Sequence, residues 1–150
     1  MGSREREHFF DRGVQYYAAA RFAAFAWLNP LSGNLFHHAI EMFLKGHLSS
    51  SRTLQQLRDF QHQLNDLWQA YKAEVADVSL ARFDRMIAEL DDFWNLRYPD
   101  HVLKHGMSCI ISIEHRHVPI DTSRPEYQYQ IVVKEIDVLV KVLFENASLN

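Results

Sequence analysis

Apolar residues recur along most of this chain at the three- and four-residue spacing of amphipathic α-helices. Asn29-Pro30 separates the first two apolar stretches, and the serine run at 49–51 ends the second. Thr53 and Ser123 each begin a capping-box sequence, which is typical of a helix N-terminus. The pattern predicts five helices, over residues 4–28, 31–49, 53–74, 80–98 and from 124 to about 144.

Residues 99–122 depart from the helical pattern. The segment Ser108–Ile113 is rich in β-branched residues, which predicts a short strand, and His117–Ile120 is its expected partner in a hairpin. Pro119 would keep that second strand at an edge. The 150 residues are therefore predicted to form one all-α domain, 1–150, with a short β-hairpin insertion around 107–120.

The first predicted helix is apolar on nearly all sides. Between Val14 and Leu28 only Gln15 and Arg21 are strongly polar, so this helix needs apolar neighbours in more than one direction. In a single four-helix bundle one side of it would stay in water. The sequence therefore predicts a homodimer, and two-fold pairing is the commonest form.

The second predicted helix carries a polar row beside an apolar face that covers more than half of its circumference. The row consists of four residues at spacings of four, three and four, which share one edge of the helix: Asn34, His38, Glu41 and Lys45. Because a helix with so wide an apolar face is mostly buried, this edge is a candidate binding site. The alternative is a solvated edge, in which the Glu41–Lys45 pair contributes only about 0.3–0.5 kcal/mol.

Arg97 falls at the centre of the apolar stripe of the fourth predicted helix, which ends before Pro99. A buried guanidinium keeps its charge and therefore needs an anionic partner. The candidates are Glu41, Asp100 and Asp137. The alternative is that Arg97 extends from a frayed helix end into water.

The overall composition narrows the class of partner and compartment. A net charge of −3 offers no basic excess for a long nucleic-acid duplex, although a nucleotide or a structured RNA stays open. The single cysteine, Cys109, excludes an intrachain disulfide, and the longest apolar stretch is too short to span a membrane. No signal peptide is expected from the charged first residues, so the sequence predicts a cytoplasmic protein without a membrane partner.

Histidine is abundant, at nine residues, and some spacings suit metal ligands. Two such pairs lie in the segment 101–117: His101 with His105, and His115 with His117. Loop histidines are more often simply polar, so no metal site or cofactor is predicted there. A histidine of the second predicted helix, His37 or His38, could also bind a metal ion or exchange a proton together with Glu41. The alternative is that the carboxylate only orients the imidazole.

The segment GNLFHHAIEMFLKGHL resembles the second helix of HEPN domains, small helical modules with a recurring Ala-x-Glu-x-x-Lys signature. Here Ala39, Glu41 and Lys45 match it, with one more residue between Glu and Lys than in the tightest form. The segments YYAAARFAAFAWLNPLSG, LRDFQHQLNDLW and LRYPD fit the same arrangement. The resemblance implies an up-and-down four-helix bundle, usually dimeric, to which the fifth C-terminal helix and the hairpin would be appended.

Many HEPN proteins are metal-independent ribonucleases with an Arg and a His separated by four to six residues and paired across the dimer cleft. No Arg of this chain has a His at that separation, and the best-placed pair, Arg97 and His101, straddles Pro99. The sequence therefore predicts a catalytically degenerate HEPN-like module that binds a nucleotide, RNA or a partner protein. The predicted binding residues are Asn34, His38, Glu41, Lys45, Tyr98 and Asp100.

Two alternatives to that function stay open. One is a metal-independent endoribonuclease in which His101 transfers a proton and Arg97 stabilises the phosphorane charge. This requires the bend after Tyr98 to bring His101 back beside Arg97. The other is a purely structural dimerisation module, which would leave the Glu41–Lys45 edge in bulk water.

Overall fold

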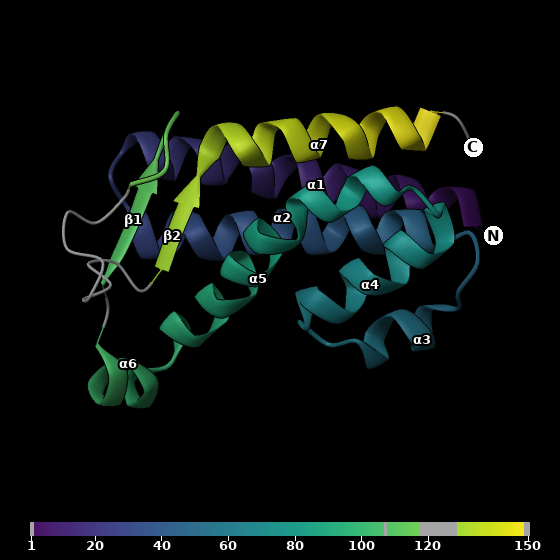
Figure 1. Cartoon of the computed structure of the whole chain (residues 1–150). Coiled ribbons are helices and arrows are strands. Elements are labelled where there is room, and N and C mark those ends of the chain that lie inside the picture. Colours follow the sequence, from purple (N-terminus) through teal and green to yellow (C-terminus); the bar gives the residue numbers. More distant parts are fainter. Residues whose placement is uncertain (1, 107, 118–128, 149–150) are drawn as a thin grey trace.

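The computed structural model describes residues 2–106, 108–117 and 129–148. Within these ranges the chain is almost entirely helical, as predicted, with one pair of short strands (Figure 1). The helices are α1 (Gly2–Phe25), α2 (Asn29–Leu48), α3 (Leu54–Asp59), α4 (Leu64–Val75), α5 (Asp84–Asp92), α6 (Pro99–His105) and α7 (Val133–Ser148). The strands are β1 (Cys109–Ser112) and β2 (Tyr129–Val132), and the 3₁₀ turns η1 (Val78–Phe83) and η2 (Phe93–Arg97) flank α5.

Helix α2 lies at the centre of the bundle, between α1 on one side and α4, α5 and η2 on the other. Six of its apolar side chains are fully buried, as its wide apolar face predicts: Phe36, Ala39, Ile40, Phe43, Leu44 and Leu48. Gly33 lets the ring of Phe93 press against the helix backbone, since a Cβ at Gly33 would lie 2.0 Å from Phe93 Cδ1. The polar row of α2 is therefore carried by a helix whose position is fixed on both sides.

The third predicted helix is divided into α3 and α4 by a turn at residues 60–63. The capping box at its start is present: the Thr53 side chain accepts from the Gln56 amide, and the Gln56 side chain accepts from the Thr53 amide. The break comes at Gln61, whose backbone is left-handed, with φ of 52°. Because of this turn, His62 does not lie where a continuous helix over 53–74 would place it.

The fourth predicted helix is also interrupted, because its end winds as the 3₁₀ turn η2. A 3₁₀ turn advances about 120° per residue, whereas an α-helix advances about 100°. Over the four steps from Phe93 to Arg97 the difference reaches roughly 80°. Arg97 is accordingly exposed rather than buried in the apolar stripe. Of the two alternatives for this residue, the structure has the solvent-facing one.

The insertion after α6 contains two short strands, but they do not form the predicted hairpin. Strand β1 pairs in parallel with β2, in the register Cys109 to Tyr129 and Ser112 to Val132. Residues 129–132, which the periodicity assigned to the last helix, are thus a strand that leads directly into α7. The predicted second strand at 117–120 lies mostly outside the described residues.

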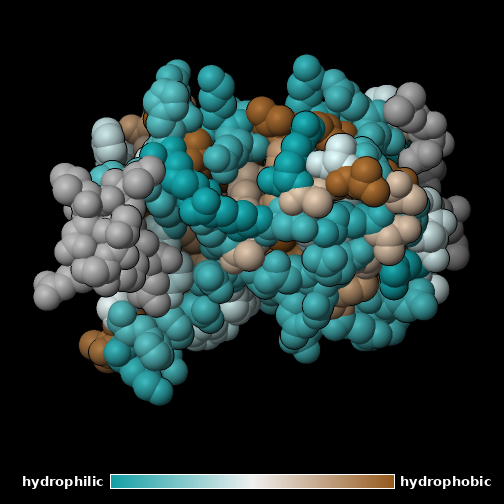
Figure 2. All heavy atoms as spheres, viewed as in Figure 1, coloured by the Kyte–Doolittle hydropathy of each residue, from teal (hydrophilic) through white to brown (hydrophobic). Residues whose placement is uncertain are grey.

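The surface seen in Figure 2 is mainly hydrophilic, with hydrophobic residues in small groups. Helix α6 stands apart from the bundle at the lower left of Figure 1, and none of its residues is buried. None of the described helices combines the length and the hydropathy needed to cross a membrane.

Candidate functional site

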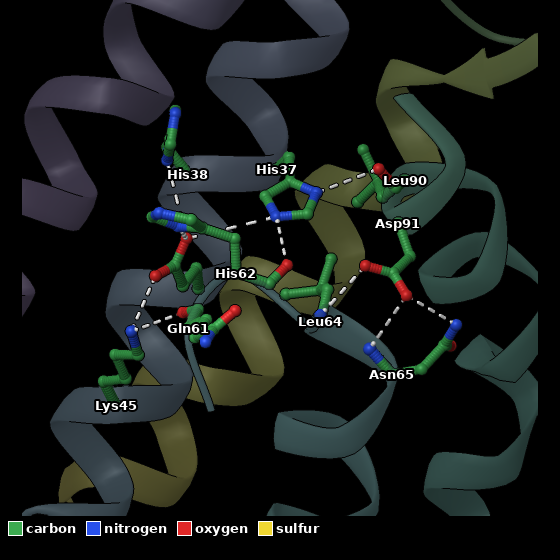
Figure 3. Close-up of polar contacts among 10 residues, drawn as sticks. His37, His38, Lys45, Gln61, His62, Leu64, Asn65, Leu90 and Asp91 are labelled. Atoms are coloured by element: carbon green, nitrogen blue, oxygen red, sulfur yellow. Dashed lines mark hydrogen bonds and ion pairs between the residues drawn. The ribbon is translucent and has the colours of Figure 1, made fainter. Parts of the chain in front are cut away.

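The polar edge of α2 holds the turn between α3 and α4. Three of its residues, at successive helical turns, each contact that turn. His37 Nε2 lies 3.1 Å from the His62 carbonyl oxygen, and Lys45 Nζ donates to the Gln61 carbonyl at 2.9 Å. Between them, Glu41 Oε2 lies 3.1 Å from His62 Nδ1. Figure 3 shows Lys45 on α2 facing Gln61 and His62 of the turn.

Glu41 is the centre of this cluster, and its side chain is 1% exposed. Lys45 Nζ donates to Oε1 at 2.7 Å, while the Nδ1 atoms of His62 and His38 lie 3.1 and 3.5 Å from Oε2. Burial alone would raise the pKa of Glu41, but His38, Lys45 and His62 together outweigh burial and lower it to about 2. Glu41 is therefore a carboxylate that stays ionised inside the protein.

His37 lies completely buried behind Glu41 and faces backbone carbonyls with both ring nitrogens. Its Nδ1 is 3.0 Å from the Leu90 oxygen, and its Nε2 is 3.1 Å from the His62 oxygen. Burial lowers the pKa of His37, against the effects of the Leu90 carbonyl and the Glu41 charge. Because the neutral ring donates from only one nitrogen, His37 can donate to only one of these two carbonyls in that state.

The turn is fixed from its other side by α5. Asp91 accepts from the Leu64 amide at 2.9 Å and from the Asn65 side chain at 2.8 Å, so it caps the N-terminus of α4 (Figure 3). The turn that carries His62 is thus held between α2 and α5. This arrangement positions His62 on Glu41 although 47% of its side chain is exposed.

Trp94 forms the outer wall of the cluster. The His62 ring stacks on Trp94 with ring centroids 4.2 Å apart, and the Arg97 guanidinium lies 4.0 Å from the Trp94 ring centroid. A pocket of about 480 Å³ begins at His62 and continues over polar side chains and Trp94. Its lining residues are Gln61, His62, Gln63, Asp91, Asp92, Trp94, Asn95 and Tyr98.

The structure brings together His38, Glu41 and Lys45 of the predicted binding residues. Asn34 instead donates to the Pro30 carbonyl at 3.0 Å within its own helix. Tyr98 lines the neighbouring pocket, and Asp100 is exposed in the first turn of α6. The predicted binding residues are therefore not one continuous site.

The predicted catalytic pair is not assembled. Arg97 lies over Trp94, whereas the ring of His101 contacts His105 in α6, with centroids 4.7 Å apart. In the described part of the chain, no hydrogen bond, ion pair or ring contact joins Arg97 to His101. Two of the three carboxylates proposed as partners of Arg97 are engaged elsewhere, Glu41 with Lys45 and Asp137 with Tyr17 and Arg21, and the third, Asp100, is exposed.

His62 is the functional residue that sequence reasoning missed. On a continuous helix over 53–74 it would lie one turn from Arg58, on the polar face. The polar run Gln61-His62-Gln63 is the one local sign of a turn, and it contains neither Gly nor Pro. In the structure the donor atoms of His38, Glu41 and His62 all lie within 4.8 Å of one another, which is close enough for a metal ion to contact all three.

Comparison with protein-family models, with curated proteins and with solved structures found no match for this chain. Two features of the structure bear on its function: the cluster around Glu41, and the exposed apolar surface at the end of α1.

Proposed function

We propose that this chain is a catalytically degenerate, HEPN-like helical module that works as a homodimer and binds a partner protein. The supporting observation is an aromatic ridge, the five exposed apolar residues at the α1–α2 junction: Phe22, Phe25, Trp27, Leu28 and Leu31. The cytoplasmic location stays a prediction.

The ridge is unusual for the surface of a monomer. Phe22 is 78% exposed, Phe25 58% and Trp27 80%, and all three lie within six residues. Scattered apolar residues are normal on a protein surface, but grouped aromatic residues mark contact sites. Two copies of such a ridge could supply the apolar centre of a two-fold interface of at least about 1,000 Å².

The chemistry of the ridge favours a protein over a nucleic acid as the second partner. Nucleic-acid affinity comes mainly from lysine and arginine contacts to phosphates, and the net charge of the chain is −3. Arg21, the basic residue nearest the ridge in sequence, already pairs with Asp137. A nucleotide or RNA stays the alternative bound molecule.

A catalytic role has less support. A ribonuclease that uses Arg97 and His101 needs both side chains on the same phosphate, and their rings and charges contact different neighbours. His101 stands on α6, which is separated from η2 only by Tyr98 but carries no buried residue. We therefore place the activity of the chain in binding.

Sedimentation velocity of three proteins tests the proposal. We expect the wild type to sediment as a dimer, and Phe25→Glu to sediment as a monomer or to lose solubility. Val78→Glu is the matched control, because Val78 is 92% exposed and lies in η1, outside the ridge. A monomeric wild type, or a dimer that Phe25→Glu leaves intact, would contradict the ridge as the interface. If a short RNA added to the wild type sediments with it, the bound molecule is RNA and the proposal of a protein partner is wrong.

A further inference from the structure

The cluster on α2 has the composition of a transition-metal site. Two imidazoles and one carboxylate approach a common point: His38 and Glu41 from α2, and His62 from the turn before α4. Nitrogen ligands with one carboxylate suit zinc, cobalt or nickel, whereas magnesium and calcium prefer an all-oxygen set. We propose that His38, Glu41 and His62 bind a divalent first-row transition-metal ion. This proposal is independent of the dimer.

The distances are close to those of a coordinated ion. At metal–ligand lengths of about 2.0–2.2 Å, tetrahedral geometry places neighbouring ligand atoms roughly 3.3–3.6 Å apart. Glu41 Oε2 lies 3.1 Å from His62 Nδ1 and 3.5 Å from His38 Nδ1. The two imidazoles need only approach one another, from a separation of at most 4.8 Å. His38 is 21% exposed and His62 47%, so both rings have room for this adjustment.

Lys45 determines how the carboxylate can bind. Its ammonium donates to Oε1 at 2.7 Å, so Oε2, the oxygen that faces both imidazoles, is the one that can bind the ion, and Glu41 is a one-oxygen ligand. The same ammonium keeps Glu41 ionised, as a metal ligand must be. Because its positive charge also repels a cation, we expect micromolar rather than nanomolar affinity.

Aromatic neighbours hold the rings of both histidine ligands. The His62 ring is held by stacking on Trp94, and the His38 ring packs on Tyr16 of α1, with centroids 5.2 Å apart. The backbone of His62 is fixed separately through its carbonyl and His37. These contacts restrict the rotation of the two rings and the movement of the His62 backbone.

Three protein ligands leave a coordination position for water or a solute. His62 belongs both to this site and to the 480 Å³ pocket lined by Trp94, Asn95 and Tyr98. A small polar molecule in the pocket could therefore reach the open position. In zinc proteins this arrangement of three protein ligands and one open position is found in catalytic rather than structural sites.

The alternative explanation is that the histidines serve only to hold the turn. In that case His62 donates a hydrogen bond to Glu41 and does not coordinate a metal ion. The two explanations differ in one measurable property, which is whether the full-length, EDTA-treated and dialysed protein binds Zn²⁺ and Co²⁺ with one ion per chain.

Calorimetric titration with Zn²⁺ and visible absorption with Co²⁺ provide the test. We expect one ion per chain, intense cobalt absorption typical of four or five ligands, and loss of at least about 100-fold in affinity with His62→Gln or His38→Gln. Removing a ligand should cost at least as much as removing a supporting residue. His62→Cys, which keeps a ligand at this position, should retain binding and add a sulfur-to-cobalt band in the near ultraviolet.

Two control variants identify the site. His115 is 88% exposed and outside the cluster, so His115→Gln should bind like the wild type. The rings of His101 and His105 contact one another in α6, away from the proposed site, so this pair is an alternative place for a metal ion. His105→Gln removes that pair and should also leave the affinity unchanged. The proposal would be overturned if the wild type binds no ion, or if His62→Gln and His38→Gln bind the ion as tightly as the wild type. Loss of binding in His105→Gln would overturn it as well.

Discussion

Replacing Glu41 by Gln removes the charge on which Lys45 and His62 converge and leaves nearly the same side-chain shape. The structure predicts a large loss of stability, because the carboxylate is 1% exposed and the Lys45 ammonium would remain beside a neutral amide. The Lys45 side chain is itself only 10% exposed. Its Gln61 carbonyl partner accepts a hydrogen bond but supplies no compensating negative charge.

Two independent arguments give the size of this loss. Removing one partner of a buried ion pair typically costs about 3–5 kcal/mol. The pKa of Glu41 is lowered from 4.5 to about 2, and at 1.36 kcal/mol per pKa unit this corresponds to about 3 kcal/mol of interaction favouring the ionised form. We therefore expect Glu41→Gln to lower the free energy of unfolding by about 3 kcal/mol.

Urea titration in the presence of EDTA, followed by circular dichroism, measures this loss without a bound metal. The matched control is Glu145→Gln, because Lys141 and Glu145 form an exposed pair with the same four-residue spacing. The control should lose less than about 0.5 kcal/mol. Adding Lys45→Met to Glu41→Gln should restore part of the stability, since no charge is then left unpaired. If Glu41→Gln costs no more than the control, Glu41 is not the centre of a buried cluster.

Three further predictions concern other parts of the chain. Arg97→Ala should cost less than about 1 kcal/mol in the same titration, because an exposed guanidinium on Trp94 contributes only a modest cation–π attraction; a loss of 3 kcal/mol or more on this scale would indicate a buried ion pair. Burial lowers the pKa of His47, so the unfolded chain binds that proton first and stability should fall as pH drops below about 6.5, less steeply in His47→Gln; equal slopes would show that His47 is not involved. Purified protein should show no EDTA-resistant cleavage of single-stranded RNA or tRNA that His101→Ala abolishes; such cleavage, leaving 2′,3′-cyclic phosphate ends, would establish the endoribonuclease.

The features that depend on local helical periodicity could be predicted from the sequence. The apolar face of α2, its burial and the common edge of His38, Glu41 and Lys45 all follow from a regular α-helix. The capping box at Thr53 is equally local. These features were predictable because they involve residues within one or two helical turns.

Features that depend on a change of helix type or on distant pairing were not predictable. The left-handed Gln61 breaks a stretch whose apolar spacing is unaltered, and this break brings His62 to Glu41. The 3₁₀ winding of η2 rotates Arg97 out of the apolar stripe by an amount that periodicity alone cannot reveal. Likewise β1 pairs with residues 129–132, whereas its predicted partner was the nearer apolar segment 117–120.

Fluorescence quenching of Trp27 tests most directly whether the ridge is the dimer interface. Trp27 is 80% exposed in the single chain, whereas Trp68 is fully buried and Trp94 partly buried. Acrylamide quenching is compared between the wild type and Trp27→Phe from nanomolar to high micromolar concentration. Our account predicts that the Trp27 contribution is quenched strongly in dilute protein and becomes protected as the dimer forms. A Trp27 contribution that stays fully quenchable at concentrations where the protein sediments as a dimer would contradict the ridge as its interface.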